Sequence, residues 1–105
     1  MKEKIKINPV TLDIVKDSLI AVSNEVFYAF ARTSMSPIIY ETLDYASGIT
    51  DVHGKLLTQG NGACAFIGLI APMIQEIVDK YGLENMKSGD VYIINDPYMG
   101  GGTHL

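Results

Sequence analysis

The sequence contains one cysteine, few positive charges and no long hydrophobic run, and each shortage excludes a class of protein. Cys64 is the single cysteine, so no internal disulfide can form, and a reducing cytoplasm is the expected compartment. Eight Lys and Arg stand against twelve Asp and Glu, which gives a formal net charge of -4. Because phosphate contacts need clustered cations, this balance disfavours nucleic acid as a partner.

The apolar stretches are too short to cross a bilayer. The longest uncharged one covers residues 62–74 and contains Pro72, whereas a membrane-spanning helix needs about 20 apolar residues. Residues 1–7 alternate charged and apolar side chains and lack the apolar segment and cleavage site of a signal peptide. We therefore expect neither membrane insertion nor secretion.

The composition is that of an ordinary globular protein. The chain has 105 residues, of which 48% are hydrophobic and 19% are charged. This length suits one small domain, which would bury roughly two thirds of the surface that the unfolded chain exposes. A packed core is therefore expected.

The first predicted element is a long helix. Asn8 followed by Pro9 is a helix start, because the side chain can cap free amides and proline presets the backbone. The pattern continues to about Arg32, with Phe27 widening the apolar surface and Ser23 in a polar strip. One apolar stripe, expected to face the core, recurs at steps of three and four: Leu12, Val15, Leu19, Val22, Val26 and Phe30.

A β-hairpin is predicted next. Pro37 ends the first pattern, and the β-branched and aromatic residues of 38–45 favour extended structure. Residues 48–50 and 55–59 flank a stretch of turn residues at 51–54, which indicates two antiparallel strands.

A second helix and a buried strand complete the predicted α+β fold. Helical spacing covers about residues 69–81, with Pro72 in the first turn and Gly82 ending the helix. Residues 91–95 form a short apolar run typical of a buried strand. The expected order is helix, two strands, helix and strand, leading into a glycine-rich loop.

This loop is the candidate functional site, because binding and catalytic residues concentrate where strands end. It contains Asp96, the glycine run Gly100, Gly101 and Gly102, and then His104. Three consecutive glycines cost folding entropy, so they are typical of a backbone that bends sharply or approaches another group closely.

Three interpretations of the loop remain open. Phosphate binding is disfavoured, because the last eighteen residues contain no Lys or Arg. In a metal or catalytic site, His104 would be a ligand and the Asp96 carboxylate a ligand or hydrogen-bond acceptor, but further ligands are needed. In the third interpretation the loop is a solvated turn. Glu41 and Asp44 flank another turn and are interpreted as solvated charges.

The whole chain resembles the N-terminal region of the hydantoinase B/oxoprolinase family. The similar segments are residues 8–12, 32–33, 36–37, 43–45, 48–51, 54–56, 88–91 and 95–105, and the most specific is Asn-Asp-Pro-Tyr followed by glycines and Thr-His-Leu. Two features differ from many members. Three glycines replace two in the loop, and Phe66-Ile67-Gly68 lacks a histidine before the glycine.

The resemblance implies a catalytic subunit that works with a hydantoinase A-type partner, which binds ATP on an actin-like fold. One chemistry of the family is ATP-dependent opening of a cyclic amide such as a hydantoin or 5-oxoproline. The other is ATP-dependent carboxylation of a ketone, as in acetone and acetophenone carboxylases. We favour the hydrolase because it is the commoner activity.

The resemblance also implies a role for the penultimate residue. In the metal-containing carboxylases, the histidine that His104 matches is a ligand of a divalent ion, together with an Asp three residues on and a later histidine. Those two positions would lie beyond Leu105. The chain, 1–105, is therefore expected to be a partial domain that ends inside the active-site loop and is inactive alone.

An alternative of another class is a non-catalytic α+β module that binds a protein partner through its apolar helix surface. Both hypotheses predict exposed hydrophobic patches on the isolated chain. They differ in whether the chain takes part in metal binding and turnover.

Overall fold

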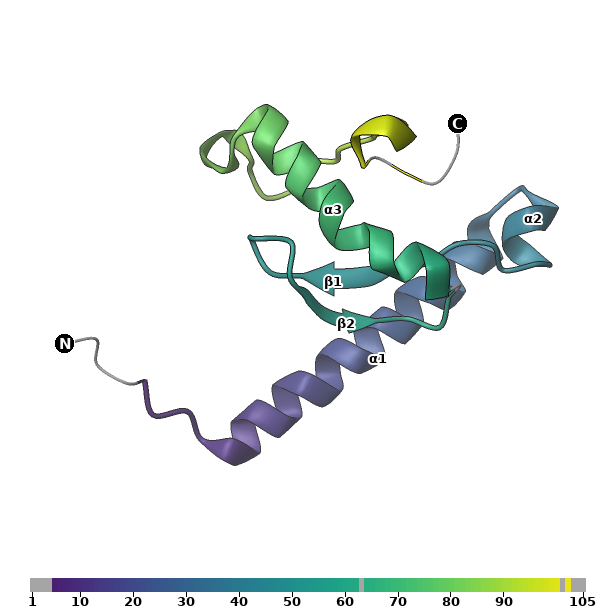
Figure 1. The fold of residues 1–105 in the computed structure, drawn as a ribbon. Helices are drawn as coiled ribbons and strands as arrows, with labels where there is room; N and C mark the ends of the chain where they lie inside the picture. Colours follow the sequence, from purple (N-terminus) through teal and green to yellow (C-terminus); the bar gives the residue numbers. More distant parts are fainter. Residues whose placement is uncertain (1–4, 63, 101, 103–105) are drawn as a thin grey trace.

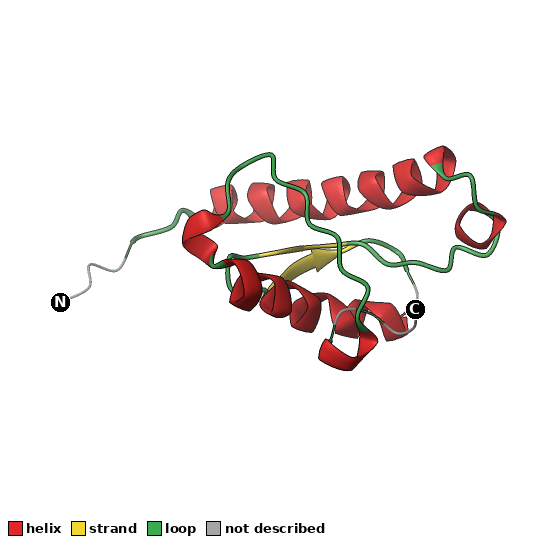
Figure 2. Cartoon of the chain, turned by 90° about the horizontal axis from the view of Figure 1, so that it is seen from above, coloured by secondary structure: helices red, strands yellow, loops and turns green. Residues whose placement is uncertain are grey.

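The computed structural model describes residues 5–62, 64–100 and 102. Three helices, α1 (Pro9–Thr33), α2 (Pro37–Tyr40) and α3 (Cys64–Tyr81), accompany one hairpin formed by β1 (Gly48–Thr50) and β2 (Leu56–Gln59). Two short 3-10 turns follow, η1 (Leu83–Asn85) and η2 (Pro97–Met99). The hairpin lies between α1 and α3 (Figures 1 and 2). This arrangement confirms the predicted α+β class.

Helix α1 begins where the sequence predicts. The Asn8 side chain accepts a hydrogen bond from the Val10 amide at 2.9 Å, and Pro9 occupies the first helical position. The helix ends at Thr33, one residue after the predicted end, where the Ser34 amide still donates to the Phe30 carbonyl. At about 1.5 Å per residue, the 25 residues of α1 extend over about 37 Å, more than the second-longest dimension of the molecule, 31 Å.

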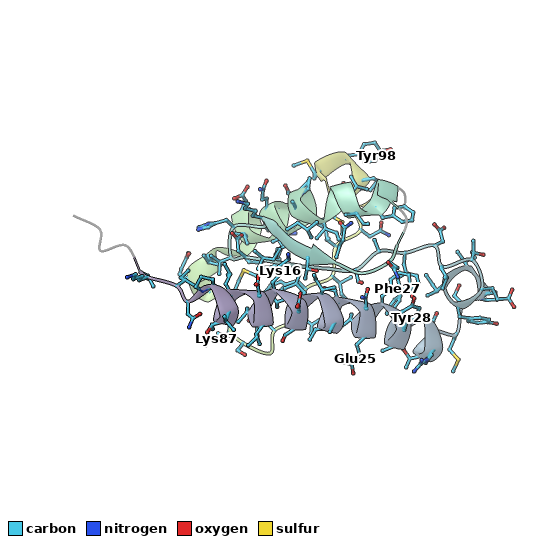
Figure 3. The ribbon with its side chains drawn as sticks, turned by 90° about the horizontal axis from the view of Figure 1, so that it is seen from below. Lys16, Glu25, Phe27, Tyr28, Lys87 and Tyr98 are labelled. Carbon is cyan, nitrogen blue, oxygen red and sulfur yellow. The ribbon has the colours of Figure 1, made fainter. Side chains whose placement is uncertain are left out.

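The core is a small contact between α1 and the chain that enters the hairpin. Phe27 is 2% exposed, and its ring stacks on Tyr45 with centroids 4.4 Å apart. The Tyr45 hydroxyl donates to the Phe27 carbonyl at 2.5 Å, and burial raises the pKa of this tyrosine. Figure 3 shows Phe27 among the side chains between α1 and the hairpin, and Glu25 on the opposite side of the helix.

The end of the hairpin approaches α1 closely beside this core. A Cβ at Gly60 would stand 2.8 Å from the Ser23 carbonyl oxygen and 2.9 Å from the Phe27 Cβ. The close approach therefore requires glycine at position 60. It also buries Ser23, whose hydroxyl has no hydrogen-bond partner among the described residues.

The predicted core stripe of α1 was wrong. Five of its six residues, all except Leu19, are between 46% and 52% exposed, whereas Ser23 and Phe27 from outside the stripe are buried. The reason is geometric: Leu12 and Val15 line an open groove beside β2, and the Phe30 ring lies at the edge of the small core, with its centroid 4.9 Å from that of Tyr45, so these side chains stay half exposed. The periodicity identified a helix with two apolar sides but not which side the hairpin covers.

The molecule is consequently more open than its composition predicts. Its accessible surface is 8365 Å², whereas a folded monomer of this mass exposes roughly 5,800 Å². It buries about half of the unfolded surface, not the expected two thirds. The radius of gyration is 15.9 Å, against about 13 Å for a compact chain of this length.

The hairpin confirms the predicted strands, with the second strand starting one residue later than expected. Its register pairs Gly48 with Gln59 and Ile49 with Thr58, and an irregularity precedes the pairing of Thr50 with Leu56. In the turn, the Asp51 carboxylate accepts hydrogen bonds from the amides of His53 and Lys55, both at 2.9 Å.

Two predictions of secondary structure need correction, one of an extended segment and one of a helix start. Residues 37–40 form α2 and are not extended, because proline after Ser36 suits the first position of a helix. Helix α3 starts at Cys64, five residues before the prediction, so Pro72 lies inside it. The proline is tolerated there because Gly68, whose carbonyl loses its amide partner, is exposed to solvent.

The predicted buried strand at residues 91–95 was also wrong. The segment joins no sheet formed by the described residues, and Val91 and Ile93 are 86% and 91% exposed. A strand needs a neighbouring strand, and the described chain supplies none beside this segment.

None of the described helices combines the length and apolar composition that crossing a bilayer requires.

The Tyr45 hydroxyl gives a first testable prediction. Tyr45→Phe keeps the stacked ring but removes a buried hydrogen bond, so we expect the unfolding free energy to fall by about 1 kcal/mol. Tyr28→Phe is the matched control, because its exposed hydroxyl only accepts a 3.4 Å hydrogen bond from Asn61. Thermal unfolding followed by circular dichroism measures both variants, and equal melting temperatures would refute the assigned role.

The hairpin turn gives a prediction about pH. Hydrogen bonds from the Lys55 and His53 amides lower the pKa of Asp51 below its usual value. A carboxyl whose pKa is lowered by folding stabilises the fold above its unfolded pKa of about 4. That contribution is lost as the pH falls through the lower folded pKa.

Asp51→Ala should therefore flatten the decline in unfolding free energy below about pH 4, measured by urea denaturation at several pH values. Asp17→Ala, which removes an exposed carboxylate of α1, is the control. An unchanged acid dependence in Asp51→Ala would contradict the hydrogen-bonded turn.

Candidate functional site

The loop after residue 95 begins with a capped 3-10 turn. The Asp96 side chain accepts a hydrogen bond from the Tyr98 amide at 3.1 Å, and its backbone carbonyl accepts one from the Met99 amide at 3.2 Å. Pro97 fills the first position of η2, where its missing amide costs nothing. Tyr98 is 90% exposed and points away from the body of the molecule (Figure 3). One oxygen of the candidate catalytic carboxylate therefore holds the turn.

Glycine is required at both described positions of the glycine run. Gly100 has φ +85° and Gly102 has φ +142°, conformations that other residues rarely adopt. A Cβ at Gly100 would lie 3.8 Å from the Pro72 Cβ, so the loop passes along the middle of α3. The prediction of a sharply bent backbone is confirmed for these two glycines, while Gly101 lies outside the described residues.

Gly102 reaches a cavity of about 280 Å³. Residues 44–46 form one wall, and α3 forms another with apolar side chains that include Leu69, Ile70 and Met73. The single ionisable carboxylate of the lining belongs to Asp44. An apolar hollow with a few polar groups is typical of a small-molecule site, although this one is at the small end of the usual range.

A larger hollow is unrelated to the loop. A groove of about 550 Å³ runs between α1 and β2, with Leu12, Leu19 and Leu57 in its lining and Lys16 as its charged residue. It shares no residue with the cavity beside Gly102. We place the candidate site at the smaller cavity, because the glycine loop reaches it.

The described residues do not form a metal site. No group of three or more His, Cys, Asp or Glu that could hold an ion occurs among them. His104, the predicted metal ligand, lies outside the described residues, and His53 belongs to the exposed hairpin turn. Asp96 alone is too few ligands for stable coordination. No chemical step through a metal follows from these residues.

The structure brings together three of the predicted site residues and adds one. Asp96, Gly100 and Gly102 belong to one loop, which approaches α3 at Gly100. Asp44, interpreted from the sequence as a solvated charge, lines the cavity that Gly102 reaches. Sequence spacing could not show this, because the approach depends on the turn at Leu43, with φ +57°, and on the packing of α3.

Comparison with known proteins adds relatives to this geometry. The hydantoinase B/oxoprolinase family matches residues 8–105. The chain is 31% identical to an uncharacterized protein of Methanocaldococcus jannaschii, covering 91% of this chain and 17% of that protein. It is 27% identical to the caprolactamase subunit beta of Pseudomonas jessenii, covering 90% and 16%.

A third relative is the 5-oxoprolinase of Dictyostelium discoideum. The chain is 25% identical to it, covering 95% of this chain and 8% of that protein. The chain thus spans about a sixth of the length of the first two relatives and less of the third. No solved structure matches it.

The cap of the loop can be tested directly. Asp96→Ala removes the acceptor of the Tyr98 amide, so that amide should exchange its hydrogen several-fold faster, as observed by NMR. Asp96→Asn keeps an acceptor oxygen and should leave the exchange near that of the unaltered chain. Equal exchange rates in Asp96→Ala and the unaltered chain would mean that the side chain does not hold the turn.

Proposed function

Because the chain belongs to the hydantoinase B/oxoprolinase family, we propose that it forms the N-terminal segment of a hydantoinase B-type catalytic subunit. The reaction is the ATP-dependent opening of a cyclic amide of the hydantoin or 5-oxoproline type. The observation that carries this proposal is the family match over residues 8–105, which includes the loop of Asp96, Gly100 and Gly102. The names of two relatives, a caprolactamase subunit and a 5-oxoprolinase, support cyclic amides as the substrate class.

The cavity suits part of such a substrate. Its volume of about 280 Å³ can accept a five-membered ring, and its α3 wall can contact the ring carbons. The Asp44 carboxylate at the lining is a hydrogen-bond acceptor for a ring N–H. Gly102 lets the loop backbone approach the ring without a side chain in between. In this proposal the chain binds and orients the ring.

The chemistry explains why a partner is needed. An amide carbonyl is a poor electrophile, because the nitrogen lone pair is delocalised into it. Transfer of the terminal phosphate of ATP to the amide oxygen releases ADP and makes the carbonyl carbon a stronger electrophile. Water then adds to that carbon, the C–N bond breaks as the nitrogen takes up a proton, and a second water releases inorganic phosphate from the acyl phosphate. We assign ATP binding to a hydantoinase A-type subunit. The name of the caprolactamase subunit beta supports a reaction shared between subunits.

A divalent ion at His104 belongs to the same proposal. Its remaining ligands would come from the rest of the B-type subunit, since the described residues supply no cluster. The carboxylation of a ketone is the competing reaction, and a purely protein-binding module is the competing class. The exposed apolar surface fits the second alternative as well, so turnover is the property that separates them.

An assay of the chain within its B-type subunit and with an A-type partner tests the function. We expect ring opening of hydantoin or 5-oxoproline that requires ATP, and no turnover by the 105-residue chain alone. We propose that the Asp96 carboxylate takes part in proton transfer, so Asp96→Asn, which keeps the turn, should lower kcat by about 100-fold or more. Consumption of ketone and bicarbonate without ring opening would replace the hydrolase by the carboxylase.

A further inference from the structure

The segment 91–95 has the sequence of a strand but does not pair with either described strand. Its residues, Val-Tyr-Ile-Ile-Asn, combine β-branched and aromatic side chains. Among the described residues it belongs to no sheet and forms no backbone hydrogen bond. Unpaired backbone groups in an apolar stretch are costly unless water or another strand satisfies them.

One face of the segment is already fixed. Tyr92 and Ile94 are half-buried against α3, where the Tyr92 and Tyr81 rings lie 5.1 Å apart. The opposite face exposes Val91 and Ile93, at 86% and 91%. Alternation of this kind is typical of a strand in a sheet that covers α3 on one side and carries a second layer on the other.

We propose that segment 91–95 is an open edge that pairs with a β-strand from the part of the hydantoinase B-type polypeptide outside the matched region. Such a strand would satisfy the unpaired backbone groups of 91–95. Apolar residues that follow or accompany it would cover Val91 and Ile93. The identity of the partner rests on the proposed function, whereas the open edge rests on the structure alone.

The area to be covered favours this partner over a second copy of the chain. The molecule exposes about 2,500 Å² more than a compact monomer of its mass, and a standard interface covers only about 800 Å² of each partner. The exposed apolar residues also lie on several elements, for example Val26 on α1, Ile38 on α2 and Ile93. A single self-complementary patch would leave most of them uncovered.

The lengths of the relatives also favour a strand from a longer polypeptide over a second copy of the chain. The region that the chain matches is 17% of the Methanocaldococcus protein and 16% of the caprolactamase subunit beta. Each of these polypeptides therefore has several hundred residues that could supply the strand.

Hydrogen exchange followed by mass spectrometry tests the proposal on two existing proteins. Amides of segment 91–95 should exchange rapidly in the 105-residue chain. The aligned amides of intact caprolactamase subunit beta should exchange at least about 100-fold more slowly. Amides of β1 and β2, protected in both proteins, are the internal reference. Equally fast exchange at the aligned segment of the intact subunit would overturn the proposal.

A second copy is a separate outcome. If the 105-residue chain sediments as a dimer and its 91–95 amides become protected at high concentration, the partner is another copy and the proposal is wrong. Neither experiment depends on catalytic activity. A failed ring-opening assay would therefore not contradict the pairing of segment 91–95. Likewise, a failed exchange experiment would not contradict the ring-opening activity.

A pair of substitutions adds a stability readout. Ile93→Asp should shift the melting temperature of the 105-residue chain by less than about 3 °C, because the side chain is exposed there. The same change at the aligned residue of the caprolactamase subunit should sharply lower its soluble yield. Val52→Asp, on the exposed hairpin turn, is the matched control and should be tolerated in both. Tolerance of the aspartate at the position of Ile93 in the intact subunit would contradict a covered edge.

Discussion

The contact between Phe27 and Tyr45 holds the described part of the molecule together. It fixes the middle of α1 to the chain that enters the hairpin, through a stacked ring pair and a buried hydroxyl bond. Gly60 brings the other end of the hairpin to the same place. Since residues 44–46 also form a wall of the cavity, the position of the candidate site depends on this small core.

So small a core leaves a fold with two kinds of surface. Near Phe27 the layers are closely packed, while the outer side of α1 and the segment 91–95 expose apolar side chains that ordinary monomers cover. The loop of Asp96, Gly100 and Gly102 lies against α3 between these regions. The candidate site is therefore locally well packed, whereas the apolar surfaces of α1 and of segment 91–95 remain exposed.

The sequence predicted features that depend on near neighbours and failed where distant ones decide. The Asn8 cap, the hairpin at 48–59 and the bent glycines follow from local chemistry, and they are present. The buried side of α1 depends on Gly60, and the fate of 91–95 depends on a neighbouring strand, so periodicity alone misassigned both. Asp44 lines the site because α3 packs beside residues 44–46, and the spacing of residues in the sequence does not reveal that packing.

The proline inside α3 has a mechanical consequence. Without an amide at Pro72, the helix lacks one internal hydrogen bond at its midpoint and is softest there. The glycine loop rests on this position, and the second half of α3 supports Tyr92 and Ile94. Pro72 therefore divides α3 into a first half whose Leu69 and Ile70 line the cavity and a second half whose Tyr81 ring contacts Tyr92.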